Sequence, residues 1–349
     1  MLKRLSFART HLLLALLLVA ALVVSAAVGA FGFSPAEMGR YVAQGLGWSA
    51  PTEGDALARN VFLRLRLPRV LLSALSGAVL GVTGTMMQGL FRNPIVEPGL
   101  VGTSAGAALG ASFVFVFGAG AFAAPLGSLA VPLLAFAGAF GATMLVYRLS
   151  TAFGKVNVFT LLLAGIAVNA VCAAGTGFLS YIARDPQARN ITFWSLGTYT
   201  TATWRGVAYV AAALAVGFAW SLRDAKALNA LMLGEDEAAY LGVDPQRLVL
   251  RLLVLNTLMV AMATAMTGVI AFVGLVVPHV LRLVRSADYR FLLPASALFG
   301  AALMAATDVV ARVLIPPAEL PIGIITALVG APVFLSILLR QGRAAGLRA

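Results

Sequence analysis

The sequence predicts an all-α, polytopic membrane protein, and two observations lead to that fold class. Of the 349 residues, 61% are hydrophobic and only 11% are charged, and the mean hydropathy is +0.96. Soluble domains carry about 45–50% apolar and about 25% charged residues. Ten apolar stretches can also be drawn, and one bilayer crossing needs roughly 20 apolar residues. An ordinary globular domain and a disordered chain are therefore excluded, and about ten transmembrane helices are expected.

The apolar stretches follow one another along a single predicted transmembrane domain, residues 1–349. The first follows Lys3, Arg4 and Arg9 and so looks like a signal peptide, but the many later segments favour an uncleaved first span. The eighth begins directly after the seventh, so a tight turn near Gly268 is expected between them. The predicted spans are 12–32, 67–90, 101–119, 126–147, 157–181, 204–222, 248–270, 271–284, 291–314 and 322–339.

The basic excess of the chain is explained by membrane topology and not by a nucleic-acid partner. The 25 Lys and Arg against 13 Asp and Glu give a net charge of +12, and membrane proteins concentrate Lys and Arg in cytoplasmic loops. With the N-terminus inside, 16 of the 25 lie on the inner side and nine on the outer side. This distribution favours cytoplasmic N- and C-termini. Residues 40–69 hold five of the outer arginines, which topology alone does not explain.

Small residues at four-residue spacing predict a tightly packed bundle, since close backbone approach drives helix association in lipid. One such row is Gly77 and Gly81, and another is Gly102, Gly106 and Gly110. The lone Cys172 lies in an apolar run, so it is expected to be a buried, inert thiol. It can form neither an internal disulfide nor a thiol-based metal site, and no metal site is predicted.

The longest inner connection, residues 223–247, contains five of the 13 acids. Gly234 followed by three acids predicts a helix end and then the acidic first turn of a short helix that Gly242 terminates. Two short helices here would expose apolar side chains to the cytosol, and such patches mark docking surfaces. A solvated, locally capped loop is the alternative. The apolar residues are Leu231, Met232, Leu233, Tyr240 and Leu241.

A nucleotide-binding loop is not found in the sequence. The phosphate-binding pattern G-x-x-x-x-G-K-[ST] requires a lysine in a defined context, and none of Lys3, Lys155 and Lys226 has it. The chain is therefore predicted to hold no cofactor and no catalytic residues, and ATP with Mg would belong to another subunit.

Seven motifs occur in a fixed order along the chain. Together they closely resemble the FecCD family, the permease subunits of ABC importers for ferric siderophores, haem and cobalamin. The resemblance covers nearly everything beyond the first span. The motifs are Arg66-Leu-Pro-Arg69, Gln88-Gly-Leu-Phe-Arg-Asn-Pro94, Gly234-Glu-Asp-Glu-Ala-Ala-Tyr-Leu-Gly-Val243, Gly268-Val-Ile-Ala-Phe-Val-Gly-Leu-Val-Val-Pro-His279, Leu292-Leu-Pro294, Ala306-Thr-Asp-Val-Val-Ala-Arg312 and Glu319-Leu-Pro-Ile-Gly323.

The resemblance implies a type II ABC importer permease fold in the bacterial inner membrane. It further implies a homodimer, two cytosolic ATPase subunits and a periplasmic haem-binding protein. It places Arg66, Arg69 and Arg312 on the outer side, where they pair with acidic residues of the binding protein. Arginine suits this role because its planar fork grips a carboxylate bidentately. Arginines that only reach toward lipid headgroups are the alternative.

The resemblance also assigns residues 223–247 to coupling helices that rest in a groove on the ATPase. Gly234, Glu235, Asp236, Tyr240 and Gly242 fall on that motif. Closure of the ATPase dimer on ATP would tilt this connection and switch a central cavity between the two membrane faces, which is alternating access between two states of similar energy.

The cargo is predicted from the stretch before Thr192-Phe-Trp-Ser-Leu-Gly197, where an arginine resembles the haem branch of the family. Arg189 and Arg184 are the residues expected to steer haem propionates at the outer mouth. Ferric siderophore and cobalamin remain as alternatives. A loop pinned at the membrane interface by an aromatic belt of Trp194, Tyr199 and Trp204 would explain the same stretch without cargo.

A secondary transporter is the rival class. It would normally carry an ionisable residue deep in a span to bind the coupling ion. The sequence places Glu97 and Asp308 in a loop or near a span end, so proton or sodium coupling is not favoured.

Overall fold

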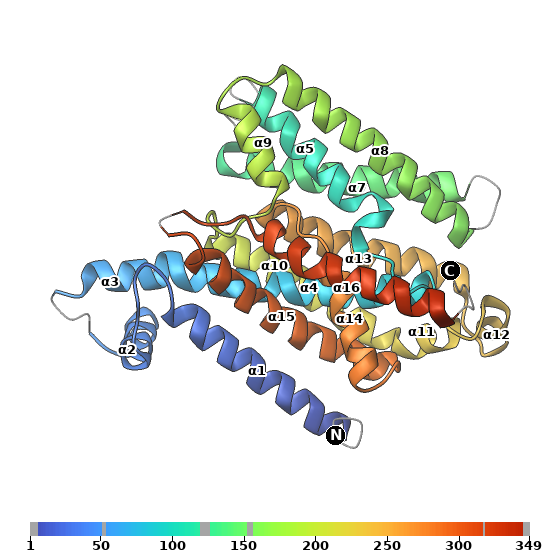
Figure 1. The fold of residues 1–349 in the computed structure, drawn as a ribbon, viewed down its shortest axis with the longest axis horizontal. Coiled ribbons are helices and arrows are strands. Elements are labelled where there is room, and N and C mark those ends of the chain that lie inside the picture. The colour runs from blue at the N-terminus through green and yellow to red at the C-terminus, as the bar shows by residue number, and fades with distance from the viewer. Residues whose placement is uncertain (1–5, 51–53, 119–125, 152–155, 317, 345–349) are drawn as a thin grey trace.

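A computed structural model describes residues 6–50, 54–118, 126–151, 156–316 and 318–344, which form a bundle of helices without a strand in those ranges (Figure 1). Lys3, Arg4 and Lys155, named above, lie outside these ranges. The predicted all-α fold is confirmed. The apolar helices are α1 (Phe7–Ala27), α4 (Leu67–Leu90), α5 (Thr103–Phe117), α7 (Ala130–Ser150), α8 (Val158–Ile182), α10 (Trp204–Arg223), α13 (Pro245–Thr267), α14 (Val273–Val284), α15 (Tyr289–Val313) and α16 (Ile322–Ala344).

Seven of the described helices are long and apolar enough to cross a membrane, and α5, α14 and the described part of α16 are shorter apolar helices. Each predicted span corresponds to one of these ten. The first is displaced toward the N-terminus, because the Ser6 side chain accepts the backbone N–H of Arg9 and caps the helix there. At its other end the chain becomes extended at Val28, ahead of a glycine at φ 156°.

The most extensive contact between described helices joins α4 to α15, and it depends on glycine. A Cβ on Gly77 would collide with the carbonyl oxygen of Gly300, and one on Gly81 with that of Ser296. A second pair, Gly106 of α5 and Gly138 of α7, meets in the same way. The predicted small-residue rows are therefore contact surfaces between helix backbones.

Replacement of Gly77 by alanine is expected to destabilise the bundle by about 1–3 kcal/mol, because the added methyl group meets rigid backbone and cannot be accommodated by a rotamer change. Thermal denaturation in detergent would measure this as a lower midpoint. Gly141→Ala is the matched control, since a Cβ there meets nothing within 4 Å. An unchanged midpoint for Gly77→Ala would show that α4 and α15 separate freely.

Two connections that are not α-helical lie between successive α-helices, within the bundle. After α4 the chain passes through residues 91–97 and the short 3-10 helix η3 (Pro98–Val101) before α5 begins. After α13 it passes through residues 268–272, where Gly268 and Phe272 have φ of 71° and 68°, so the predicted break near Gly268 is confirmed. Each break is followed by one of the shorter apolar helices, α5 after the first and α14 after the second. We call these two connections the first and second breaks.

Shorter helices at the ends of the bundle were not predicted. They are α2 (Pro35–Gly45), α3 (Ala56–Asn60), the π-helical turn η2 (Val61–Arg66) and α9 (Gln187–Ser195). Figure 1 shows α5, α7, α8 and α9 gathered in one layer (green), with α4, α13 and α15 beneath them and α1 (blue) on the far side. Cys172 on α8 is buried and free, as predicted.

Candidate docking and transport sites

Three arginines and two carboxylates meet on the predicted outer side, where α1 and α15 end and α4 begins. We call Arg66, Arg69, Asp308, Arg312 and Glu319 the outer arginine cluster. Asp308 is fully buried and bridges two arginines: its Oδ1 accepts Arg69 Nε at 2.9 Å, and its Oδ2 accepts Arg312 Nε at 3.0 Å. Glu319 lies 2.8 Å from Arg69 Nη1. The cluster thus holds one positive charge more than its carboxylates neutralise.

The other two arginines attach the end of α1 to this cluster. Arg66 donates to the carbonyl oxygens of Val28 and Phe31 and lies over the ring of Phe33. Arg312 donates to the carbonyl and the hydroxyl of Ser25 at 2.9 and 3.0 Å. These contacts satisfy carbonyls that the end of a helix leaves without partners, and the positive charge complements the negative end of its dipole.

The arginines predicted to dock a binding protein are therefore more enclosed than the sequence indicated. Arg66 and Arg312 are buried, and Arg69 is largely so. All three also line a cavity of about 580 Å³, together with Tyr199 and Glu319. A partner would meet them through this cavity and not as free side chains on a flat surface. Their docking role stays a prediction.

The inner connection contains the two helices that the sequence predicts, α11 (Ala225–Leu231) and α12 (Glu235–Tyr240). Gly234 and Gly242 have φ of 140° and 84°, conformations that glycine adopts without strain. The expected apolar exposure is confirmed, with one correction. Leu231 is buried because α11 packs that side against the bundle, whereas the exposed residues are Met232 (46%), Leu233 (67%), Tyr240 (90%) and Leu241 (64%).

Of the remaining coupling residues, Glu235 lies 3.7 Å from Arg92, and Asp236 is exposed. The insert is also joined to α15. Asn229 Nδ2 donates to Asp288 Oδ1 at 2.8 Å, and its Oδ1 accepts the N–H of Tyr289 at 3.1 Å. Movement of α11 would therefore pull directly on the first residue of α15.

Asp288 caps α15 and is predicted to make its inner end sensitive to acid. Hydrogen bonds from Arg290 and Asn229 lower the pKa of Asp288 from 3.8 to about 2. A lowered pKa adds stability above the unfolded value of 3.8, and this stability is lost as the pH falls through about 2. Asp288→Ala should cost about 1 kcal/mol at neutral pH by loss of the cap, seen as a lower thermal midpoint. An equal midpoint at neutral pH would contradict this account.

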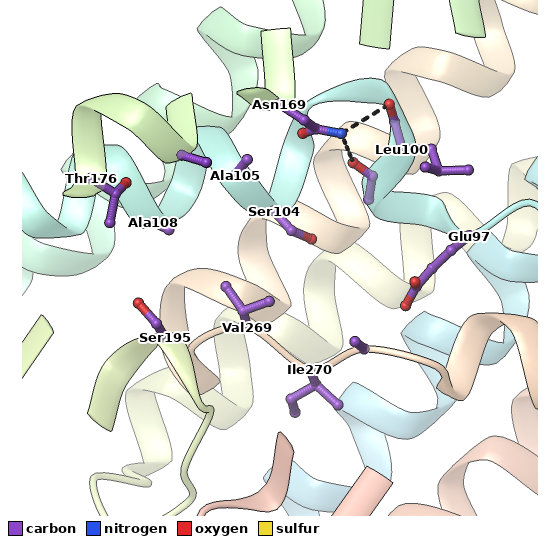
Figure 2. A pocket seen from close by; sticks show the side chains of 13 residues that line it. Glu97, Leu100, Ser104, Ala105, Ala108, Asn169, Thr176, Ser195, Val269 and Ile270 are labelled. Atoms are coloured by element: carbon purple, nitrogen blue, oxygen red, sulfur yellow. Dashed lines mark hydrogen bonds between the residues drawn. The ribbon is translucent and has the colours of Figure 1, made fainter. Parts of the chain in front are cut away.

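A cavity of about 460 Å³ lies beside the two breaks (Figure 2), and we call it the polar cavity for the few polar side chains in its otherwise apolar wall. Glu97, from the first break, accepts the N–H of Phe272, from the second, at 2.6 Å. Asn169 on α8 donates to the carbonyls of Gly99 and Leu100 at 3.4 and 3.3 Å, as the dashed lines in Figure 2 show. Irregular backbone inside a membrane is tolerated where protein groups satisfy it, and these side chains do so.

Glu97 lies in the connection after α4, where the sequence placed it, and it contacts the second break through the N–H of Phe272. This side chain is half-buried, and its carboxylate faces the cavity. Asp308 lies near the end of α15, also as expected, and it is completely buried and pairs with two arginines. The sequence could not reveal these contacts because they join distant segments.

The two arginines predicted to meet the cargo lie at the start of α9. Arg184 and Arg189 are both exposed, and the Arg189 guanidinium lies over the ring of Phe193. Ser195, at the other end of α9, lines the polar cavity. The aromatic-belt alternative is wrong for Tyr199, which is buried and lies 2.5 Å from the Ser76 hydroxyl.

A bundle of apolar helices, interrupted twice beside a cavity with a carboxylate in its wall, is typical of an integral membrane transporter. The profile of the FecCD transport family matches residues 16–340. The chain belongs to this family, as its motifs indicated.

Three relatives show how closely the chain follows the family. It is 43% identical to the hemin transport system permease protein of Yersinia pestis over 302 residues, 84% of this chain and 87% of that one. It is 40% identical to the cobalamin import system permease protein of Halobacterium salinarum, over 85% of this chain and 80% of that one. It is 37% identical to the vitamin B12 import system permease protein of Escherichia coli O17:K52:H18, over 96% of each.

The fold is similar to a solved inward-facing structure described as a metal-chelate type ABC transporter. The TM-score is 0.82 at 30% sequence identity, and the match covers 95% of this chain and 99% of that one. The protein is therefore a membrane permease of the ABC transporter type, a class that works with ATPase partners.

Proposed function

We propose that the chain is the transmembrane permease subunit of an ATP-driven importer that carries haem from the periplasm across the bacterial inner membrane. The observation that carries this proposal is the 43% identity to the hemin permease, which extends over 84% of the chain. Cobalamin is the second candidate cargo, because relatives named for its import are 37–40% identical. Ferric siderophore is the third, on the sequence resemblance.

The proposed assembly has two copies of this chain, two cytosolic ATPase subunits and a periplasmic haem-binding protein, with both chain termini in the cytosol. ATP and Mg would be held by the ATPase, since the three lysines lack a nucleotide-binding context. The exposed apolar side chains around α11 and α12 offer the ATPase a contact surface.

On the outer side, the outer arginine cluster supports docking of the binding protein by charge. Its excess positive charge faces a cavity of about 580 Å³, and a carboxylate from a partner would neutralise it through charge-assisted hydrogen bonds. The cluster has three arginines and only two carboxylates, those of Asp308 and Glu319. In this proposal an acidic residue of the partner supplies the missing negative charge.

Arg189 and Arg184 are proposed to receive the two haem propionates at the outer mouth. Both side chains are exposed, and neither has an ion pair with a described carboxylate. Guanidinium groups that are free in this way can pair with incoming carboxylates.

The proposal is tested by haem-stimulated ATP hydrolysis of the reconstituted complex. We expect the haem-loaded binding protein to stimulate hydrolysis, and Arg184→Ala/Arg189→Ala to reduce haem uptake by about tenfold through loss of charge pairing, with docking unchanged. Arg64→Ala is the control, an exposed arginine outside the cluster. Unchanged haem uptake in the double variant would contradict the assignment of these arginines to the propionates. Stimulation of ATP hydrolysis by cobalamin and not by haem would show that cobalamin is the cargo.

A further inference from the structure

The polar cavity beside the breaks contains polar side-chain atoms that the described part of the protein leaves without hydrogen-bond partners. Asn169 Oδ1 and Thr176 Oγ are buried and have no hydrogen-bond partner there. Glu97 accepts only the N–H of Phe272 among the described residues. Figure 2 shows these three side chains, with Ser104 between them, around the cavity.

An acceptor without a donor is costly inside a protein, by about 1–3 kcal/mol for a neutral group and more for a charged one. An ionisable side chain within a membrane protein is retained where it serves a function. The cavity lining supplies no basic residue that could neutralise Glu97, and most of the other lining side chains are small: Gly99, Ala105, Ala108, Ala173 and Ala271. The wall thus leaves space beside acceptors that lack donors.

We propose that this cavity is a cargo-contact site for the uncharged edge of the cargo, and that Glu97 makes it reject anionic groups. The inference rests on the proposed transport function. Its ligand chemistry follows from the wall, which offers oxygen acceptors and one carboxylate and has no cation that could bind a carboxylate.

Because of the position of α9, the cargo would contact two regions of opposite charge, the basic Arg189 and the cavity that contains Glu97. Arg189 and Ser195 lie six residues apart on this helix, about 9 Å at 1.5 Å per residue. Asn169 and Thr176, seven residues apart on α8, extend the acceptor wall by about 10 Å. An anionic edge of the cargo would thus be held at Arg189 while its opposite edge enters the cavity.

The single cysteine makes a direct test possible. In a Cys172→Ser background, Ser104→Cys and Thr176→Cys would each place one thiol at the cavity wall. Each variant is reconstituted with the ATPase and binding protein in liposomes. Two membrane-impermeant thiosulfonates are compared, one with a trimethylammonium group and one with a sulfonate. Tyr181→Cys on α8 is the control, because Tyr181 is exposed and does not line the cavity.

Relative to the rates at Tyr181→Cys, we expect the cationic reagent to react with the cavity thiols about tenfold or more faster than the anionic one, because charges interact strongly away from bulk water. Glu97→Gln should abolish the preference. Absence of reaction at both cavity positions, or equal rates with Glu97 present, would overturn the proposal. ATP hydrolysis by each variant confirms that the complex has assembled.

Cargo contact is tested by protection of the same thiols. We expect haem-loaded binding protein and ATP to slow modification at Ser104→Cys and not at Tyr181→Cys. If only cobalamin protects the thiol, the cavity is a cargo-contact site but the cargo is cobalamin and not haem. This result distinguishes failure of the proposed cargo from failure of the proposed site. Protection by neither haem, cobalamin nor a ferric siderophore would overturn cargo contact.

Discussion

Asp308→Ala is expected to lower the stability of the protein more than any other single substitution considered. Its carboxylate is fully buried and pairs with Arg69 and Arg312 at 2.9 and 3.0 Å. Removal of one partner from a buried ion pair leaves uncompensated charge and costs about 3–5 kcal/mol. Since Arg312 also holds the end of α1, through Ser25, the attachment of that helix should loosen as well.

Cys172 provides the readout for this prediction. Its thiol is buried in the folded chain, so a thiol-reactive dye reports unfolding as the temperature rises. Asp55→Ala is the control, because the Arg40–Asp55 pair is partly exposed, and such pairs contribute about 0–1 kcal/mol. Equal midpoints for the two variants would mean that the outer arginine cluster does not hold the helices together.

Loss of the exposed apolar surface on the inner insert is the second large effect. Leu233→Glu combined with Leu241→Glu should reduce ATP-driven uptake by at least about tenfold, since central apolar contacts dominate the energy of protein interfaces. Both side chains are mostly exposed, at 67% and 64%, so the thermal midpoint should not change. The two measurements together separate a docking surface from a structural one.

Arg247→Ala is the matched control for this experiment. Arg247 lies in the same inner connection and is exposed, but it pairs only with the neighbouring Asp244. Normal uptake by the Leu233/Leu241 double variant would contradict the assignment of α11 and α12 to the ATPase contact. A similar loss in Arg247→Ala would show that the whole connection is sensitive to substitution.

The features that the sequence predicted correctly have local signals. The spans are visible as apolar runs, and the helix ends at Gly234, Gly242 and Gly268 are visible because few other residues adopt those backbone angles. The contact of Gly77 with α15 was visible only as a small-residue row, which indicates close packing but does not name the partner.

The features that the sequence missed depend on contacts between distant residues. Arg69 and Asp308 are 239 positions apart, and Glu97 and Phe272 are 175 apart. Sequence spacing carries no signal for such pairs, so the arginines were predicted only as docking residues, and the contact of Glu97 with Phe272 was not predicted. Leu231 was expected to be exposed for a similar reason, because only the fold shows which side of α11 meets the bundle.

The most direct test of the transport account is uptake of labelled haem by liposomes that contain the assembled complex, with the binding protein outside and ATP inside. The account predicts that haem accumulates only when both ATP and the loaded binding protein are present, and that excess cobalamin does not compete. Accumulation without ATP would contradict an ABC-type mechanism. ATP-dependent accumulation of cobalamin in place of haem would keep the permease and contradict its proposed cargo.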